Sequence, residues 1–343
     1  MRSSLKSATE LTALLALAVT GCSPGSGTTA DAAPTTAAAA APAPTAPTAG
    51  AGTSYAPYVS ATTAYGTDSA GSPTAYNLAF VISDTTGCTP KWGGDRAVDD
   101  TAVANRIGAL KKSGAAVRVS FGGASGKELA TVCDSASALA EAYGRALDAA
   151  GAALADFDVE GDTLGDAASV ARRSQAIALL QKERPGLEVT FTLPVMPDGL
   201  DADGLALLAS ANRYDVQVST VNLMTMNYGE SYTGDMGDYA VTAATAAHAQ
   251  LEKVFGLSGT AAWRGMALTS MIGVNDIAGE TFTLADAARL RSFAETKEIA
   301  WVSMWSAFRD RQCATGDASG SDAATDCSGV PQEVGAFGRA LAG

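Results

Sequence analysis

Histidine, cysteine and basic residues are scarce in this sequence of 343 residues. One His and five Cys, with no CxxC spacing, do not favour a zinc site. Lys and Arg number 23 against 36 Asp and Glu, and the net charge of −13 would repel nucleic acid or an anionic membrane surface. We therefore expect a neutral substrate, no nucleic-acid partner and no metal or other cofactor.

Long hydrophobic runs are also missing, except at the N-terminus. Arg2 and Lys6 precede an apolar run over 11–19, which is followed by "VTGC". This arrangement is typical of an export signal, and a Cys after small residues resembles a bacterial lipobox. We predict that residues 1–22 are a lipoprotein-type signal peptide with Cys22 as the lipidation site; the alternative is an ordinary secretory signal. The protein would be exported, either lipid-anchored at the cell membrane or extracellular, with the lipid as its only membrane contact.

Residues 23–53 contain no aromatic and no large aliphatic residue. A segment rich in Ala, Thr and Pro cannot bury enough apolar surface to order itself, so we predict a disordered linker. Residues 54–343 are the predicted folded domain, and 47% hydrophobic residues in the chain are enough for a sizeable core.

Four cysteines remain once Cys22 is assigned to the lipid anchor. An exported protein meets an oxidising compartment, where an even number of cysteines indicates disulfides. Of the three possible pairings, we favour the one that closes the shortest loops, which joins Cys88 to Cys133 and Cys313 to Cys327.

Short apolar segments alternate with helical patterns along the folded domain. Helical spacing is clearest over 139–150 and 241–255, and the second pattern places His248 on an outer helix with no chemical role. Eight β-then-α units favour an α/β fold of the (β/α)8 TIM-barrel type over an open doubly wound sheet. The first unit lacks a convincing helix. The predicted strands are 55–59, 76–83, 116–123, 154–161, 187–195, 218–229, 265–274 and 300–308.

Three carboxylates alternate along the fourth predicted strand, in "DFDVEGD". Side chains at i, i+2 and i+4 share one face of a strand, so Asp156, Asp158 and Glu160 would crowd together. Such crowding raises at least one pKa and yields a candidate general acid. A structural ion-pair network is an alternative, but no Lys or Arg is nearer in the sequence than Arg145 and Arg172. A calcium loop is another, but its twelfth position is Ala, not Glu.

Other polar residues fall at or near the C-terminal ends of predicted strands, where TIM barrels form their active sites. The glycines in "FGGASGKE" have the wrong spacing for a phosphate loop; paired glycines at a strand end instead allow close approach of backbone or substrate. The strand-end residues are Asp158, Glu160, Tyr228, Asn275, Asp276 and Trp305.

Four motifs together resemble glycoside hydrolase family 18, the chitinases. They are "SFGG", "DFDVE", "MTMNYG" and "MWSAFRD", on the third, fourth, sixth and eighth predicted strands, with "WGG" and "MIGVND" as in one branch of the family. The resemblance implies substrate-assisted retaining hydrolysis, an exception to the usual two-carboxylate scheme. Glu160 would be the general acid, Asp158 would orient the sugar's N-acetyl group, and Asp156 would tune Asp158.

The resemblance also implies a set of residues that contact substrate. Tyr228 would contact the acetamido group, and Trp305 would form the floor beneath the sugar ring at the cleavage point. The chain departs from the wider family at Ala153, Asn227 and Gly229, where many members carry Asp. The further expected substrate-binding residues are Met226, Asn227, Gly122, Gly123, Asn275 and Asp276.

The sequence therefore predicts an exported chitinase that hydrolyses β-1,4-linked N-acetylglucosamine polymers, acting as a monomer. Three alternatives stay open: an endo-β-N-acetylglucosaminidase on N-glycans, a non-catalytic chitin-binding surface lipoprotein, and a divalent-metal enzyme that uses the same carboxylates. The expected partner is chitin or another glycan that contains N-acetylglucosamine.

Overall fold

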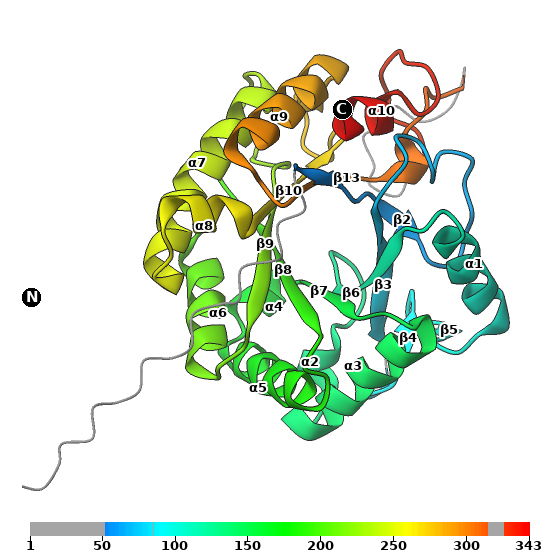
Figure 1. The fold of residues 1–343 in the computed structure, drawn as a ribbon, viewed down its shortest axis with the longest axis vertical. Helices are drawn as coiled ribbons and strands as arrows, with labels where there is room; N and C mark the ends of the chain where they lie inside the picture. Colours follow the sequence, from blue (N-terminus) through cyan, green and yellow to red (C-terminus); the bar gives the residue numbers. More distant parts are fainter. Residues whose placement is uncertain (1–51, 85, 315–325) are drawn as a thin grey trace, which may run out of the picture. The chain divides into compact units, whose positions relative to one another are not determined.

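The structure is a computed structural model that describes residues 52–84, 86–314 and 326–343. The predicted signal peptide, Cys22 and nearly all of the predicted linker lie outside these residues. The described residues form a barrel of parallel strands surrounded by helices, as predicted (Figure 1). The barrel strands are β1 (Ser54–Tyr55), β2 (Tyr58–Ser60), β3 (Ala75–Ser83), β6 (Ala116–Gly122), β7 (Leu154–Asp158), β8 (Glu188–Pro194), β9 (Val218–Met224), β10 (Met266–Met271) and β13 (Trp301–Trp305).

The first predicted strand is divided into two short strands that close the barrel. β1 pairs with β13 on one side, and β2 pairs with β3 on the other, both in parallel. Pro57 lies between them; since proline has no backbone N–H to donate, the ladder is interrupted there. Around the rest of the barrel the neighbours follow the chain order from β3 through β6, β7, β8, β9 and β10 to β13.

Several strands end earlier than the sequence predicts. β7 stops at Asp158 rather than at 161, β9 stops at Met224 rather than at 229, and β13 gives way to the 3₁₀ turn η1 (Ala307–Arg309). The residues beyond these ends include Glu160 and Tyr228. The early ends free these residues from the sheet ladder, at the C-terminal end of the strands.

Helices form the outer ring of the barrel, and as predicted none follows the first strand within 61–74 (Figure 1). Two small additions extend the sheet region: β4 (Pro90–Trp92) with β5 (Arg96–Ala97), and β11 (Gly273–Val274) with β12 (Thr281–Phe282). The helices are α1 (Thr101–Lys111), α2 (Leu129–Val132), α3 (Ala136–Ala150), α4 (Asp162–Gly165), α5 (Ala167–Glu183), α6 (Ala202–Arg213), α7 (Met236–Phe255), α8 (Gly259–Arg264), α9 (Leu284–Lys297) and α10 (Ala336–Ala342).

Both helical patterns read from the sequence correspond to outer helices. Ser135 caps α3 through its hydroxyl, and Gly151 ends it in the left-handed conformation, which glycine adopts at little cost. His248 lies on α7, where its ring stacks on Trp263 with centroids 4.0 Å apart and a ring nitrogen contacts Gly259 O at 2.8 Å. Its contacts are structural. None of the helices in the described ranges has the length and apolarity that a membrane span requires.

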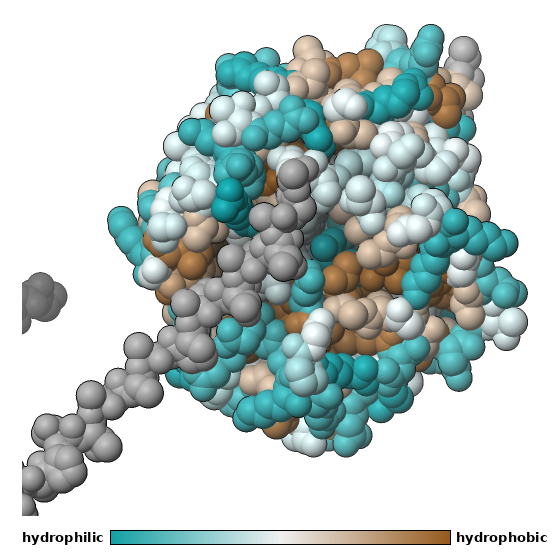
Figure 2. Space-filling model, viewed as in Figure 1, coloured by the Kyte–Doolittle hydropathy of each residue, from teal (hydrophilic) through white to brown (hydrophobic). Residues whose placement is uncertain are grey.

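The core between barrel and helices is built on the outward-facing strand residues. Phe157 packs against Phe121 and Phe191 of the neighbouring strands, with ring centroids 5.3 and 5.9 Å apart. Because side chains alternate along a strand, this fixes Asp156 and Asp158 on the opposite, inner side. Figure 2 shows apolar residues gathered in a hollow towards the middle of the face drawn, with hydrophilic residues around it.

Both predicted disulfides are present, Cys88–Cys133 and Cys313–Cys327. The first closes a loop with a sequence separation of 45, against 14 for the second. On the loop-entropy model they contribute about 4 and about 3 kcal/mol to the free energy of unfolding.

We expect replacement of the first cysteine pair by alanines to lower the free energy of unfolding, measured in guanidinium, more than replacement of the second pair. The reverse order would contradict the entropic account.

Candidate active site

The three alternating carboxylates lie where β7 ends at the mouth of the barrel. Asp156 is fully buried, Asp158 is 5% exposed, and Glu160 is half-buried just beyond the strand. The first two belong to the strand and face inward, so the crowding expected from the sequence is present.

Asp156 is held by three hydroxyl groups from three other strands of the barrel. Ser120 and Tyr58 donate to its Oδ2 at 2.5 and 2.9 Å, and Thr192 donates to Oδ1 at 2.6 Å. Burial raises the pKa of Asp156, while these hydrogen bonds and the charge of Arg118 oppose the rise. Because all three hydroxyls donate, the cage favours the ionised form and fixes the orientation of the carboxylate.

Within the described ranges, no such cage surrounds Asp158 or Glu160, and Asp158 Oδ1 is buried without a hydrogen-bond partner. Burial raises the pKa of Asp158 well above its ordinary value, with further rises from the charges of Glu160 and Asp156. Burial, followed by the charge of Asp276, raises the pKa of Glu160 to about 7. A carboxylic acid with that pKa carries its proton for about half of the time at neutral pH, as a general acid requires.

The connection between β10 and α9 supplies one wall of the site. Asp276 is exposed on it and accepts a hydrogen bond from Asn227 Nδ2 at 3.3 Å. Asn275, also predicted to contact substrate, is 1% exposed, and its amide nitrogen donates to Met271 O and Gly273 O. These bonds hold the loop together.

Tyr228 lies just past β9, in a turn with Met226, Asn227 and Gly229. Its ring contacts Tyr232 and Tyr239 at centroid distances of 5.9 and 5.8 Å. The hydroxyl is buried and has no hydrogen-bond partner in the described part of the chain. A buried hydroxyl without a partner costs free energy, so it is a candidate ligand contact. Met226 is half-buried and Asn227 is exposed beside it.

Trp305 ends β13 as part of an aromatic cluster, which we define as Tyr58, Phe80, Trp305, Phe308 and Tyr65. The ring of Trp305 stacks on Phe80 at 5.5 Å and meets the edges of Tyr58 and Phe308 at 5.8 and 5.6 Å. Tyr65 packs on Phe308 at 5.5 Å. Apart from Tyr58, whose hydroxyl reaches Asp156, these rings are partly exposed, and flat apolar faces of this kind suit sugar rings.

Gly122 and Gly123 bring the end of β6 against the end of β7. Gly122 has φ +97°, and a Cβ there would lie 2.1 Å from Asp158 O; one at Gly123 would lie 2.9 Å from the ring of Phe80. Gly123 N donates to Asp158 O at 3.0 Å. The sequence left backbone or substrate open as the approaching partner, and in the structure these glycines accommodate backbone and an aromatic ring.

Arg118 is the charged residue that the sequence reading missed near the carboxylates. It is 7% exposed, donates to Asn77 Oδ1 at 2.6 Å and lies 4.7 Å from the ring of Trp301. It is far from Asp156 in the sequence but lies on the adjacent strand. Among the residues described, however, no ion pair includes Asp156, Asp158 or Glu160, so the ion-pair network considered from the sequence does not form.

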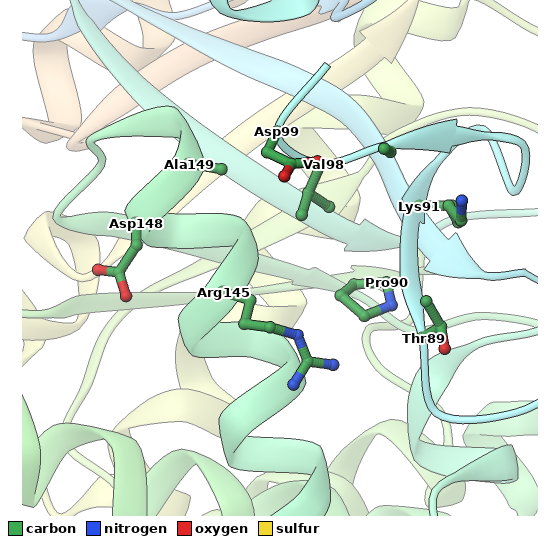
Figure 3. Close-up of a pocket in the computed structure, with 9 residues that line it drawn as sticks. Thr89, Pro90, Lys91, Val98, Asp99, Arg145, Asp148 and Ala149 are labelled. Atoms are coloured by element: carbon green, nitrogen blue, oxygen red, sulfur yellow. The ribbon is translucent and has the colours of Figure 1, made fainter.

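Two further features concern possible ligand sites. No group of three or more His, Cys, Asp or Glu side chains within residues 52–84, 86–314 and 326–343 is arranged to hold a metal ion. A hollow of about 590 Å³ lies between β4 and α3, where Arg145 faces Pro90 and Asp148 points away (Figure 3). None of the predicted site residues lines this hollow.

The effect of Asp276 on Glu160 can be tested by titration. Asp276→Asn removes a like charge, so the ionised form of Glu160 becomes easier to reach and its pKa should fall below about 7. Carboxyl ¹³C NMR across pH 4–9 would follow it directly. Glu230→Gln removes an exposed acid from the same rim and serves as the control. An unchanged Glu160 midpoint in Asp276→Asn would contradict the electrostatic coupling.

Two known proteins are similar in sequence to this chain. The chain is 33% identical over 249 residues to the "Probable bifunctional chitinase/lysozyme" of Escherichia coli (strain K12), and 32% identical over 250 residues to "Endochitinase 11" of Metarhizium anisopliae. Each match covers 68% of this chain but only 28% and 47% of those proteins, so the chain spans between about a quarter and a half of their length. No protein-family model matches.

Solved structures of chitinases are similar to this chain in fold. The catalytic domain of the hyperthermophilic chitinase from Pyrococcus furiosus superposes with a TM-score of 0.74 at 27% identity, covering 87% of this chain and 95% of that domain. A GH18 chitinase from Pseudoalteromonas aurantia shares the fold at 14% identity, with a TM-score of 0.55.

Proposed function

This chain carries the catalytic-domain fold of the family 18 chitinases, and we propose that it hydrolyses β-1,4-linked N-acetylglucosamine polymers with retention of configuration. The observation that carries the proposal is Glu160, whose pKa of about 7 follows from burial and then from the charge of Asp276. The relatives named as chitinases support the substrate class, and a Pyrococcus furiosus chitinase domain with the same fold has been solved with chito-oligosaccharides.

In the proposed reaction, Glu160 acts together with the acetamido group of the substrate. Glu160 gives its proton to the glycosidic oxygen as the bond from that oxygen to the anomeric carbon breaks. The acetamido oxygen of the same sugar attacks the anomeric carbon from the other side and forms an oxazolinium ion. Water then opens this ion and returns a proton to Glu160, so two inversions leave the configuration retained.

Asp158 orients the acetamido group and stabilises the positive charge that develops on it. Its buried Oδ1 has no partner among the described residues and is available for the acetamido N–H. The hydroxyl cage favours the ionised form of Asp156 against the effect of burial, and a charge on Asp156 raises the pKa of Asp158. The Tyr228 hydroxyl completes the contacts to the acetamido group.

The remaining site residues line the sugar path in this proposal. Trp305 forms the floor beneath the reacting sugar, and the aromatic cluster extends this floor through Phe308 to Tyr65 for further sugar units. Met226, Asn227 and Asp276 form the wall near Tyr228. Gly122 and Gly123 contribute by letting the strand ends approach, so their effect on substrate is through Asp158 and Phe80.

We further propose that the enzyme is exported, carries a lipid at Cys22 and acts as a monomer at or outside the cell membrane. The basis for export and lipidation is the sequence of residues 1–22, which lies outside the described residues. Mass spectrometry of Cys22 in the purified native protein tests the lipid, and an ordinary secretory signal would leave it unmodified.

The decisive experiment is anomer-resolved product analysis on a short chitin oligomer. We expect β-anomeric products and no hydrolysis of the fully de-N-acetylated oligomer, because the acetamido oxygen is the nucleophile. Chelator should leave the rate unchanged, whereas a divalent-metal enzyme would lose activity. Products released only from a glycoprotein would favour the N-glycan alternative, and binding without turnover would favour the non-catalytic one. Inverted products would overturn the mechanism.

A further inference from the structure

Glu280 is a buried acid that no motif in the sequence singled out. It lies in the β10–α9 connection, between Asp276 and β12, and is 0% exposed. Its Oε1 accepts the N–H of Gly229 at 2.8 Å, while its Oε2 is buried and has no hydrogen-bond partner among the described residues. Burial raises the pKa of Glu280, and the backbone N–H groups of Gly229, Asn227 and Tyr228 oppose this rise. The turn that holds Tyr228 is therefore tied to a side chain that follows about 50 residues later.

The turn that receives this carboxylate is not a relaxed one. Asn227 has φ +54° and Gly229 has φ +117°, both in the left-handed half of backbone space. Glycine adopts such a conformation at little cost, whereas a non-glycine residue such as Asn227 is held in it by its surroundings. The Gly229 N–H points at the Glu280 carboxylate, which ties the end of the turn to the β10–α9 connection. Without the carboxylate, the Gly229 N–H would need another partner.

The element that presents Glu280 is itself well anchored. Arg309 Nη2 donates to Val274 O at 2.7 Å and to Ile272 O at 3.3 Å, and Glu280 N donates to Ile277 O at 3.2 Å. Asn275 ties the same loop to Met271 and Gly273. A carboxylate on a rigid loop can define the position of a strained turn.

We propose that Glu280 is a positioning residue, which fixes the turn Asn227–Gly229 so that the Tyr228 hydroxyl meets the acetamido group of the sugar. The inference rests on the proposed function. The hydroxyl is buried and has no protein partner among the described residues, so the position of the turn decides what it contacts. In addition, burial and then the nearby Glu280 charge raise the pKa of Tyr228, so the hydroxyl keeps its proton and can donate.

Glu280→Gln tests the inference because it keeps the volume and one acceptor oxygen but removes the negative charge and turns the other oxygen into a donor beside the turn. On a chitin tetramer we expect kcat to fall about tenfold to a hundredfold with KM changed by less than about threefold, since a small misplacement acts on the transition state. Asp286→Asn is the matched control. It removes another buried acid nearby in the sequence, in the first turn of α9, which caps that helix and does not touch the turn at Tyr228, so kcat should stay within about twofold.

A double-mutant cycle with Tyr228→Phe separates positioning from general structural damage. If Glu280 acts through the Tyr228 hydroxyl, Glu280→Gln should lower kcat by less than about threefold when Tyr228→Phe is already present. Multiplicative losses, or an unchanged kcat in the single variant, would overturn the inference. Should Glu280→Gln not fold, Glu280→Asp shortens the reach while keeping the charge, and the same cycle applies. A wild-type protein without turnover would instead refute the proposed function.

Discussion

Glu160→Gln is expected to lower kcat on chitin oligosaccharides by about 10³-fold, because the variant has no proton to give to the glycosidic oxygen. The glutamine side chain keeps the size of the acid, so the surrounding packing should be preserved. Substrate should still bind, so KM should change little. Initial rates with a chitin tetramer, analysed by chromatography, would measure both constants.

A substrate with a better leaving group provides the control for Glu160. An aryl N-acetylglucosaminide releases a phenolate that needs little protonation, so Glu160→Gln should lose far less activity on it than on the natural linkage. In the wild type, the rate on the tetramer should fall as the pH rises through about 7, where Glu160 loses its proton. Equal losses on both substrates would contradict the role of general acid.

The fold was predictable because strand and helix patterns alternate along the chain and the inner and outer faces of each strand differ. In β7, Phe157 packs outward while Asp156 and Asp158 face inward. The alternation of side chains along a single strand predicts this arrangement without knowledge of the neighbouring strands. The disulfide pairing was also within reach, because the favoured solution closes the shorter loops. Strand ends were less certain, since residues such as Glu160 leave the ladder without any break in the pattern.

The hydroxyl cage and Glu280 could not be predicted in the same way. Tyr58, Ser120 and Thr192 reach Asp156 from three other strands, and their meeting depends on the register and closure of the barrel. Glu280 meets the turn at Tyr228 through a loop with no periodic pattern. An inward-facing polar residue on a barrel strand is a signal that could have suggested Ser120 and Thr192; for Glu280 the sequence holds no such signal.

The aromatic cluster combines one residue that was predicted from the sequence, Trp305, with rings that were not. Trp305 was predicted as the floor beneath a sugar, and the structure places it among Phe80, Tyr58 and Phe308 at the mouth of the barrel. Phe80 lies in a strand of mostly apolar residues, so its sequence context gave no reason to separate it from the core. Only the close approach of β3 to β13 through the closing strands β1 and β2 reveals the cluster.

Asp158→Asn is the second change with a large expected effect, of about 10²- to 10³-fold in kcat, the usual cost of losing a charged group that stabilises developing charge. The asparagine has the same shape but no negative charge to balance the oxazolinium ion. Its amide also turns a donor towards the acetamido N–H. Unlike the loss at Glu160, this loss should be similar for aryl and natural substrates, because it acts on ring closure rather than on the leaving group.

The contrast between Asp158 and Asp156 makes this prediction specific. Asp156→Asn changes a residue that contacts hydroxyls rather than the sugar, so we expect a smaller loss in kcat than for Asp158→Asn, together with lower stability from the disturbed cage. Thermal unfolding of both variants separates the two effects. If Asp158→Asn retained wild-type turnover while binding the tetramer normally, the acetamido group would not depend on this carboxylate, and attack by a different nucleophile would have to explain the hydrolysis.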